Sequence, residues 1–135
     1  MQTKPYLTLT DVKAIASAAE AEAVRNNWNV TIAIVDDGGH LLWLQRMDGA
    51  QPITAHLAPA KAHTAALGRR ESRLYEETIN NGRISFLSAP VLEGMLEGGV
   101  PVVVGGHVIG AVGVSGVKST DDVLIAKAGI AALGV

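Results

Sequence analysis

Residues 98–115 read GGVPVVVGGHVIGAVGVS, two runs rich in valine and isoleucine that are joined by a Gly-Gly pair. β-branched side chains favour the extended backbone of a strand, and glycines adopt the positive φ angles that a two-residue turn between antiparallel strands requires. The segment therefore predicts a β-hairpin that turns at Gly105-Gly106 and places Val104 opposite His107. The glycines inside the second run indicate that a helix or a ligand approaches this strand closely.

A second hairpin is predicted upstream, over residues 30–46. Its strands are 30–36 and 41–46, and DGGH between them favours a tight turn with Asp37 opposite His40. The second strand carries apolar side chains on both faces, so we expect helices or another subunit to cover it. A short fifth strand is predicted at 84–87.

Helical periodicity and capping residues predict four helices and one helical turn around these strands. The predicted spans are about 10–26, 54–67, 72–79, a turn at 90–96, and a final helix that starts at Ser119. In this order, strands arrive as hairpins while helices are grouped between them and at both ends. The arrangement predicts an α+β fold with an antiparallel sheet of about five strands flanked by helices, in a single domain over residues 1–135.

Composition narrows the function classes. The chain has 135 residues, 48% of them hydrophobic, with a net charge of −2 and no cysteine. Its lysines and arginines are scattered, so nucleic acid and anionic membranes are not expected as partners. The sequence offers neither a signal-peptide core nor a membrane-length apolar run, and we expect a cytoplasmic protein. Without cysteine, chemistry depends on histidine, carboxylates, hydroxyls or lysine.

Five motifs occur in a distinctive order. They are IVDDGGHL (34–41), RMDGA (46–50), KAHTAA (61–66), GGVPV (98–102) and GAVGVSG (110–116). Together they resemble the GlcG/HbpS family, which includes the C-terminal domain of PduO-type proteins. The resemblance implies a profilin-like sandwich, frequent homo-oligomers, and haem-associated or corrinoid-associated roles for some members. Two features depart from the family pattern: Val117 stands where a glycine is frequent, and residues 88–97 replace a shorter glycine-rich approach.

The four histidines are the main candidates for chemistry. His56 and His63 are seven residues apart on one predicted helix, so they share a face but are too distant to chelate one metal. Either offers an axial nitrogen for haem iron or a general base. His63 is favoured because it lies in KAHTAA, whereas His56 is expected at the surface. His107 and His40 sit on solvated turns or serve a site, and Asp37 is a candidate to orient His40.

Charged residues give weaker signals. Arg46 and Lys61 suit a carboxylate or a haem propionate, although a solvated charge on a strand end or helix flank is the commoner explanation for such residues. Glu93 and Glu97 are four residues apart and share a face if their segment is helical. Asp121 and Asp122 are explained as acidic residues at a helix N-terminus.

These observations favour a small-molecule-binding domain, with haem or a related tetrapyrrole as the ligand that the resemblance implies. A cofactor-independent enzyme for a small acidic metabolite, with His63 or His107 as the base, and a structural oligomer remain open. The candidate ligand-binding residues are Arg46, Lys61, His63, His107, Gly110 and Gly113. We expect the cavity between the helix that bears Lys61 and His63 and the strands flanking Gly105-Gly106, away from the first hairpin turn.

Overall fold

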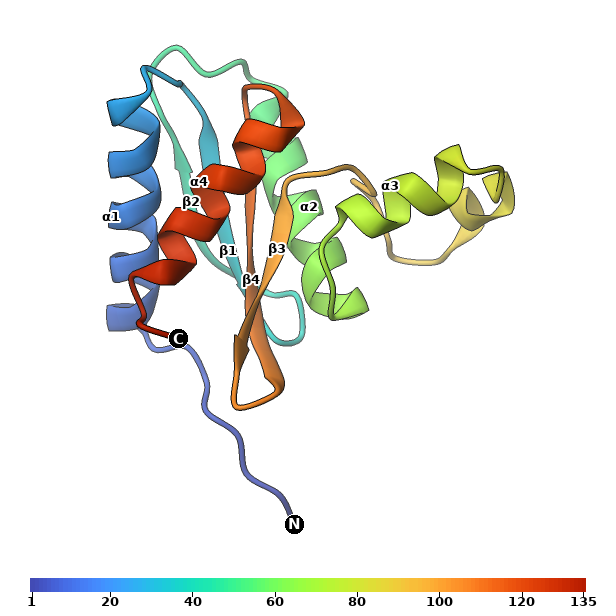
Figure 1. The fold of residues 1–135 in the computed structure, drawn as a ribbon, viewed down its shortest axis with the longest axis horizontal. Helices are drawn as coiled ribbons and strands as arrows, with labels where there is room; N and C mark the ends of the chain where they lie inside the picture. The colour runs from blue at the N-terminus through green and yellow to red at the C-terminus, as the bar shows by residue number, and fades with distance from the viewer.

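The computed structural model describes residues 1–135 and contains one antiparallel sheet with helices on both faces (Figure 1). Its elements are α1 (Leu9–Arg25), β1 (Thr31–Asp36), β2 (Leu41–Arg46), α2 (Thr54–Gly68), α3 (Arg73–Asn80), the 3-10 helix η1 (Ile84–Ser88), β3 (Gly99–Val104), β4 (His107–Ser115) and α4 (Ser119–Ala131). The predicted α+β class is therefore confirmed. No helix has the length and apolarity needed to span a bilayer.

The sheet has four strands, in the order β2-β1-β4-β3, and not the predicted five. Both predicted hairpins are present, and Val104 pairs with His107 as expected. The first turn differs from the prediction, because Val35 pairs with Leu41 and the amide of Asp36 donates to the carbonyl of His40. The turn is therefore longer than two residues and does not place Asp37 opposite His40.

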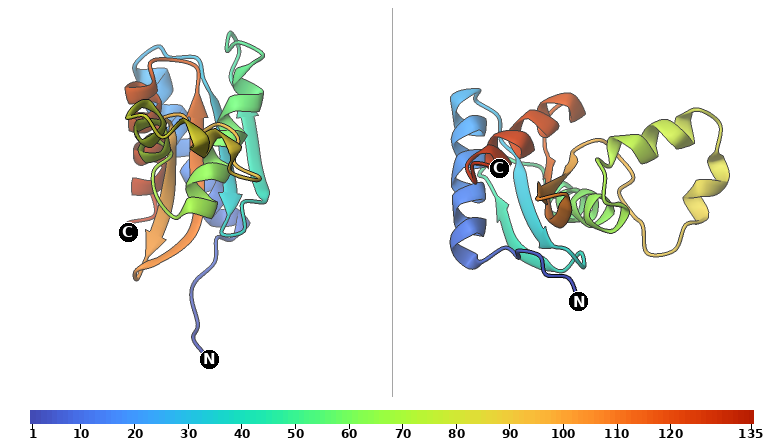
Figure 2. Two further views of the ribbon diagram at one scale, coloured as in Figure 1. Left: turned by 90° about the vertical axis from the view of Figure 1, so that its right-hand side faces the viewer. Right: turned by 60° about the horizontal axis from the view of Figure 1, so that its bottom comes forward.

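Helices cover both faces of the sheet (Figures 1 and 2), and each face has its own apolar cluster. On one face, α1 and α4 pack together over a core of aliphatic side chains that includes Ile15, Ile32 and Ile125. On the other face, α2 packs through alanines, among them Ala58 and Ala62. β1 and β4 are therefore buried on both faces, and each fully buried aliphatic side chain contributes about 1.5–3 kcal/mol.

Glycine allows α2 to lie directly on the sheet. A Cβ added at Gly113 of β4 would fall 2.1 Å from the carbonyl oxygen of Ala58 and 2.6 Å from the amide nitrogen of Ala62. No side chain fits between these backbones, so any substitution at Gly113 would displace the helix. The close approach predicted from the glycines of this strand is that of a helix.

Helix starts differ in detail from the predictions. α1 begins at Leu9 with Thr8 as its N-cap, and Thr8 and Asp11 form a capping box. The hydrogen bonds from Thr8 hold the pKa of Asp11 below its ordinary value. α4 begins at Ser119 as predicted, and no side chain makes a cap hydrogen bond at its N-terminus.

Residues 69–98, here called the arm, project from the body of the molecule (Figure 1). The two ends of the arm are joined at Ser72, whose amide donates to the carbonyl of Gly99 and whose hydroxyl accepts from the amide of Gly99 at 2.8 Å. The same hydroxyl donates to the carbonyl of Leu96 at 2.5 Å. Ser72 occupies the N-cap position of α3, but its side chain makes no cap bond and instead closes the base of the arm.

The predicted fifth strand and helical turn both fall in the arm and are wrong. Residues 84–87 belong to η1, where Phe86 packs on Tyr75 with ring centroids 5.3 Å apart. The arm extends away from the sheet, so this apolar stretch has no strand edge to pair with. Residues 90–96 are not helical, and Glu93 and Glu97 therefore share no helical face.

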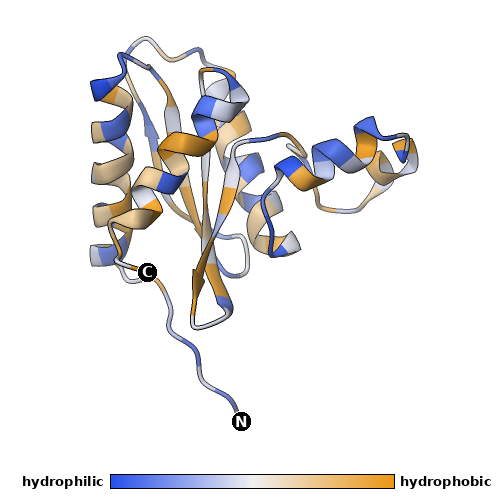
Figure 3. Cartoon of the chain, in the orientation of Figure 1, coloured by the Kyte–Doolittle hydropathy of each residue, from blue (hydrophilic) through white to orange (hydrophobic).

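Several of the exposed large apolar side chains lie on β2 and in the arm. Figure 3 shows the hydropathy of each residue along the ribbon. On β2, Leu41 is 53% exposed and Leu44 is 46% exposed. In the arm, Ile84, Leu87 and Val91 are at least 60% exposed. A strand at the edge of a sheet with apolar faces is a typical protein interface.

We therefore predict a homo-oligomer, and Leu44→Glu should weaken it because a charge would be placed on the apolar edge strand. Light scattering at micromolar protein should give a mass above 14.0 kDa for the natural chain and a lower mass for the variant. Leu124→Glu on α4, a residue exposed to 52%, is the matched control. A natural chain that is only monomeric would contradict the prediction.

Candidate functional site

His63 is held in one orientation by the first hairpin turn. Its side chain is half-buried on α2, and its Nδ1 lies 3.0 Å from the carbonyl oxygen of Gly39. Because a carbonyl only accepts hydrogen bonds, Nδ1 carries the proton and Nε2 carries the free lone pair. Histidines that bind metals in proteins usually have this arrangement, in which the bonded nitrogen fixes the tautomer and the other nitrogen binds.

Gly39 makes this contact possible. Its φ is +80°, a conformation that suits glycine, and a Cβ added there would lie 2.6 Å from Nδ1 of His63. The turn can therefore approach the imidazole only without a side chain at this position. The neighbouring Gly38 has no such constraint, because a Cβ there meets mainly the mobile ring of His40 at 3.1 Å.

A cavity of about 380 Å³, here called the His63 cavity, opens between the first hairpin turn and the outer surface of α2. Its lining residues are Val35, Gly39, Leu41, Ala55, His56, Pro59, Ala60, His63, Val91 and Glu93. The volume is within the range of small-molecule sites, and such sites combine apolar walls with a few polar groups. Here the polar groups are two imidazoles from one face of α2 and a single carboxylate.

The rim of the His63 cavity is strained at Val91. This β-branched residue has a φ of +57° and is 73% exposed. Left-handed backbone is rare for β-branched residues, and strained positions of this kind gather at ligand sites. The arm therefore contributes a constrained residue to the cavity.

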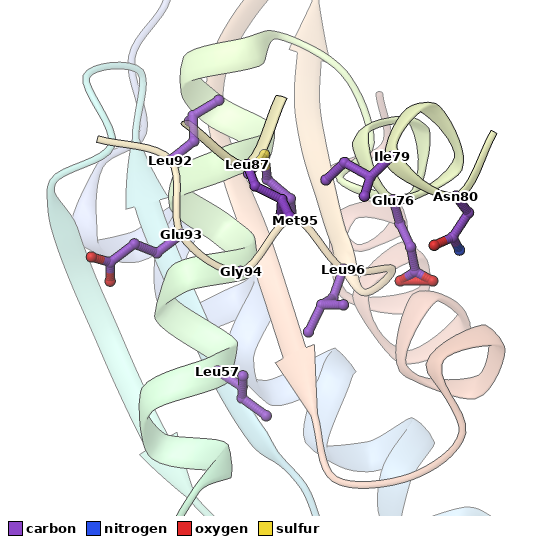
Figure 4. Close-up of a pocket in the computed structure, with 10 residues that line it drawn as sticks. All are labelled: Leu57, Glu76, Ile79, Asn80, Leu87, Leu92, Glu93, Gly94, Met95 and Leu96. Carbon is purple, nitrogen blue, oxygen red and sulfur yellow. The ribbon is translucent and has the colours of Figure 1, made fainter. Parts of the chain in front are cut away.

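A second cavity, of about 360 Å³, lies between α2 and the arm (Figure 4). Its wall is mostly aliphatic, and Met95 is its one sulfur-containing residue. Glu93 belongs to both cavities, and Figure 4 shows its side chain pointing away from the apolar residues of this one. The arm cavity contains no imidazole, so it suits an apolar group and not a ligand that needs a nitrogen donor.

Lys61 and Asp122 form a buried ion pair. The ammonium lies 3.1 Å from the carboxylate and 3.1 Å from the carbonyl oxygen of Val114, and the two side chains are 5% and 2% exposed. Asp122 also accepts from the amide of Val117. Burial raises the pKa of Asp122 above its ordinary value, and Lys61 offsets only part of this effect.

This ion pair connects the two helical layers, because Lys61 belongs to α2 and Asp122 to α4, on opposite faces of the sheet. The lysine side chain passes Gly98, where an added Cβ would lie 2.7 Å from its Cδ. The sequence alone explains Asp122 only as an acidic residue at a helix N-terminus. In the structure, Asp122 also forms a buried ion pair with Lys61. Lys61 lines none of the four cavities.

The other predicted site residues do not gather around His63. Arg46 pairs with Thr31 at the end of the sheet opposite to the first hairpin turn, and its Nε donates to the carbonyl of Ala50. His107 lines a separate cavity near the second hairpin turn. Gly110 and Gly113 line no cavity, because chain packs against both.

The expected location of the cavity is therefore wrong in one respect. No cavity joins His63 to the strands that flank Gly105-Gly106, and His63 faces the first hairpin turn instead. His40 is exposed and lines no cavity, and Asp37 forms an ion pair with Lys4, which lowers the pKa of Asp37. The Asp37–His40 pair considered from the sequence is absent.

Two long-range side-chain contacts could not be predicted from the sequence. The bond between Gly39 and His63 joins residues 24 apart, and the pair of Lys61 and Asp122 joins residues 61 apart. Both partners of the first contact lie within motifs already singled out, DGGH and KAHTAA, but no local pattern connects them. His56 is exposed as expected, yet it lines the same cavity as His63.

The fold and the His63 cavity define the class of protein: a small α+β domain built around one antiparallel sheet, with a site suited to a small ligand. The chain belongs to the HbpS-like family, since the family model "Haem degrading protein HbpS-like" matches residues 7–131. This confirms the family that the five motifs indicated.

Relatives and solved structures agree with this assignment. The chain is 58% identical over 115 residues to Protein GlcG of Escherichia coli K12, with 85% of each chain covered. It is 30% identical over 142 residues to Corrinoid adenosyltransferase PduO of Salmonella typhimurium, covering 99% of this chain but 41% of PduO.

Two solved structures are especially informative for the fold and the ligand class. A PduOC:heme complex superposes with a TM-score of 0.85 at 28% identity, with 95% of both chains covered. A double mutant of Streptomyces reticuli HbpS gives a TM-score of 0.89 at 30% identity, covering all of this chain and 92% of that one. Haem binding is therefore supported for the family.

Lys61→Met should destabilise the fold by about 3–5 kcal/mol, because it leaves the carboxylate of Asp122 buried without its cation. Urea unfolding at neutral pH measures this loss. The double variant Lys61→Met/Asp122→Asn should recover more than half of it, since no charge remains buried and the amide oxygen still accepts from Val117. A loss below about 1 kcal/mol in the single variant would contradict the structural role of the pair.

Proposed function

We propose that this protein binds haem or a related tetrapyrrole in the His63 cavity, with Nε2 of His63 as an axial ligand. The single observation that carries the proposal is the hydrogen bond from Nδ1 of His63 to the carbonyl of Gly39, which leaves Nε2 free beside a cavity. The haem complex of the related PduOC domain and the HbpS-like family model support the choice of ligand.

The residues of the cavity fit such a ligand. Val35, Leu41 and Pro59 offer an apolar wall for a planar macrocycle, and the imidazole of His63 offers the nitrogen that haem iron prefers in a chain without cysteine. When bound, haem supplies an iron centre with redox and ligand-exchange chemistry. The protein's own residues would hold the imidazole of His63 in one tautomer and exclude water from one face of the macrocycle.

The lining of the His63 cavity carries little charge. The lining contains no lysine or arginine, and its one carboxylate is that of Glu93. Lys61 and Arg46, the predicted partners of the propionates, lie elsewhere. Haem propionates would therefore find no cationic partner in this lining, and the carboxylate of Glu93 would repel them.

The geometry favours binding over the alternative of an enzyme that uses His63 as a base on a small acid. Such an enzyme needs a cation near the base to hold the substrate carboxylate. The nearest basic residue in sequence, Lys61, is committed to Asp122. The apolar wall around His63 suits a large hydrophobic ligand better than a small acid.

Haemin titration followed by the Soret band tests the assignment of the ligand. His63→Ala should weaken haemin binding at least about tenfold and shift the Soret maximum, because an axial nitrogen is lost. His56→Ala is the matched control, since His56 lines the same cavity from the same helix but is exposed, and it should change affinity less than about twofold. Unchanged affinity and spectrum in His63→Ala would contradict the proposal.

Gly39→Ala tests the role of the first hairpin turn. The added methyl group occupies the space of the imidazole nitrogen, so the variant should bind haemin more weakly and with a mixed or shifted Soret band. Gly38→Ala introduces the same methyl group one residue earlier without touching His63 and should bind like the natural chain. Circular dichroism checks that both variants are folded. Equal affinities for the two variants would show that the turn does not position His63.

A further inference from the structure

A separate cavity of about 290 Å³ lies where the second hairpin turn, the C-terminal end of α2 and the N-terminal segment meet. Its lining residues are Lys4, Arg69, Val103, Gly106, His107 and Val108. Three of the six carry nitrogen donors at the ends of their side chains, and none is acidic. This is an unusual concentration of positive charge in a chain whose net charge is −2.

Arg69 is held there in a strained backbone. Its φ and ψ are 56° and 33°, the left-handed conformation that follows many helices and that glycine normally occupies. The glycine at this helix end stands one residue earlier, at position 68, where an added Cβ would lie 2.2 Å from the hydroxyl of Tyr75. The left-handed position carries an arginine, for which this backbone conformation is less favourable than for glycine. This strain indicates that the side chain has a use.

The guanidinium of Arg69 and the imidazole of His107 make no hydrogen bond or ion pair within the chain. Lys4 pairs with Asp37, which does not line the cavity. Neighbouring Arg70 is engaged differently, since it stacks on the ring of Tyr75 at 4.3 Å. The donors of Arg69 and His107 are thus free around a polar hollow, as sites for oxygen anions require.

We infer that this cavity binds a small anion with several oxygen acceptors, of the kind presented by a phosphate group or a small dicarboxylate. Arg69 provides the planar pair of donors that such groups favour, Lys4 adds a second positive charge, and His107 adds a third donor. Gly106 has a φ of +80° and no side chain, so the turn leaves the hollow open. The site is independent of the haem proposal, because it uses another cavity and another histidine.

Isotope-edited NMR titration and calorimetry of the full chain test this inference, with inorganic phosphate and malonate as the two probes. We expect saturable binding of at least one probe, with the largest shifts at the amide of Gly106 and the imidazole of His107. Saturation by phosphate alone assigns the site to phosphorylated ligands, and saturation by malonate alone assigns it to carboxylates. Saturation by both probes supports a site that binds phosphate groups and small dicarboxylates alike.

The variant Arg69→Gly separates binding from folding. Glycine adopts the left-handed conformation without strain, so this variant should keep or raise the melting temperature while affinity for the probe falls at least about tenfold. His107→Leu should weaken binding as well, whereas Arg25→Ala, at an exposed arginine of α1, should leave it unchanged. Failure of both probes to saturate, or equal affinity in Arg69→Gly and the natural chain, would overturn the inference.

Discussion

The backbones of α2 and β4 are in contact at Gly113, and this contact fixes the distance between the helix and the sheet. A carbonyl oxygen of the helix occupies the space that a side chain on the strand would need. Alanines along the same side of α2 then bury its face without holding it away from the sheet. Since α2 rests on the sheet at one fixed height, the residues on its other sides take fixed positions too.

Three residues on α2 or at its C-terminal end have different roles in the structure. Lys61 passes the sheet near Gly98 and reaches Asp122 on the opposite layer, which fixes how α2 and α4 sit relative to each other. His63 meets the first hairpin turn at Gly39 and is oriented by it. Arg69 ends the helix in a left-handed turn beside the second hairpin. Two cavities with different chemistry, one apolar with imidazole and one cationic, thus lie near the same end of the sheet.

Local patterns predicted the elements well, and long-range contacts explain where prediction stopped. Glycine pairs between β-branched runs predicted both hairpins, because turn and strand preferences act over a few residues. Residues 84–87 have the composition of a strand but lie in an arm with no strand edge beside them, so tertiary context decided their structure. Lys61 was predicted as a candidate ligand-binding residue, but its partner Asp122 is 61 residues away. No local sequence pattern around Asp122 indicates that the two residues pair.

Haem binding as proposed depends on the nitrogen of His63 that remains free, and NMR of the haemin complex measures which histidine nitrogen binds the iron. In protein labelled with ¹⁵N at histidine, we expect one strongly hyperfine-shifted histidine, assigned to His63, that retains the proton on Nδ1 and is bound through Nε2. That result would connect the hydrogen bond to Gly39 with the ligand site. A shifted imidazole assigned to His107, or a complex in which no histidine resonance shifts, would contradict haem binding through Nε2 of His63.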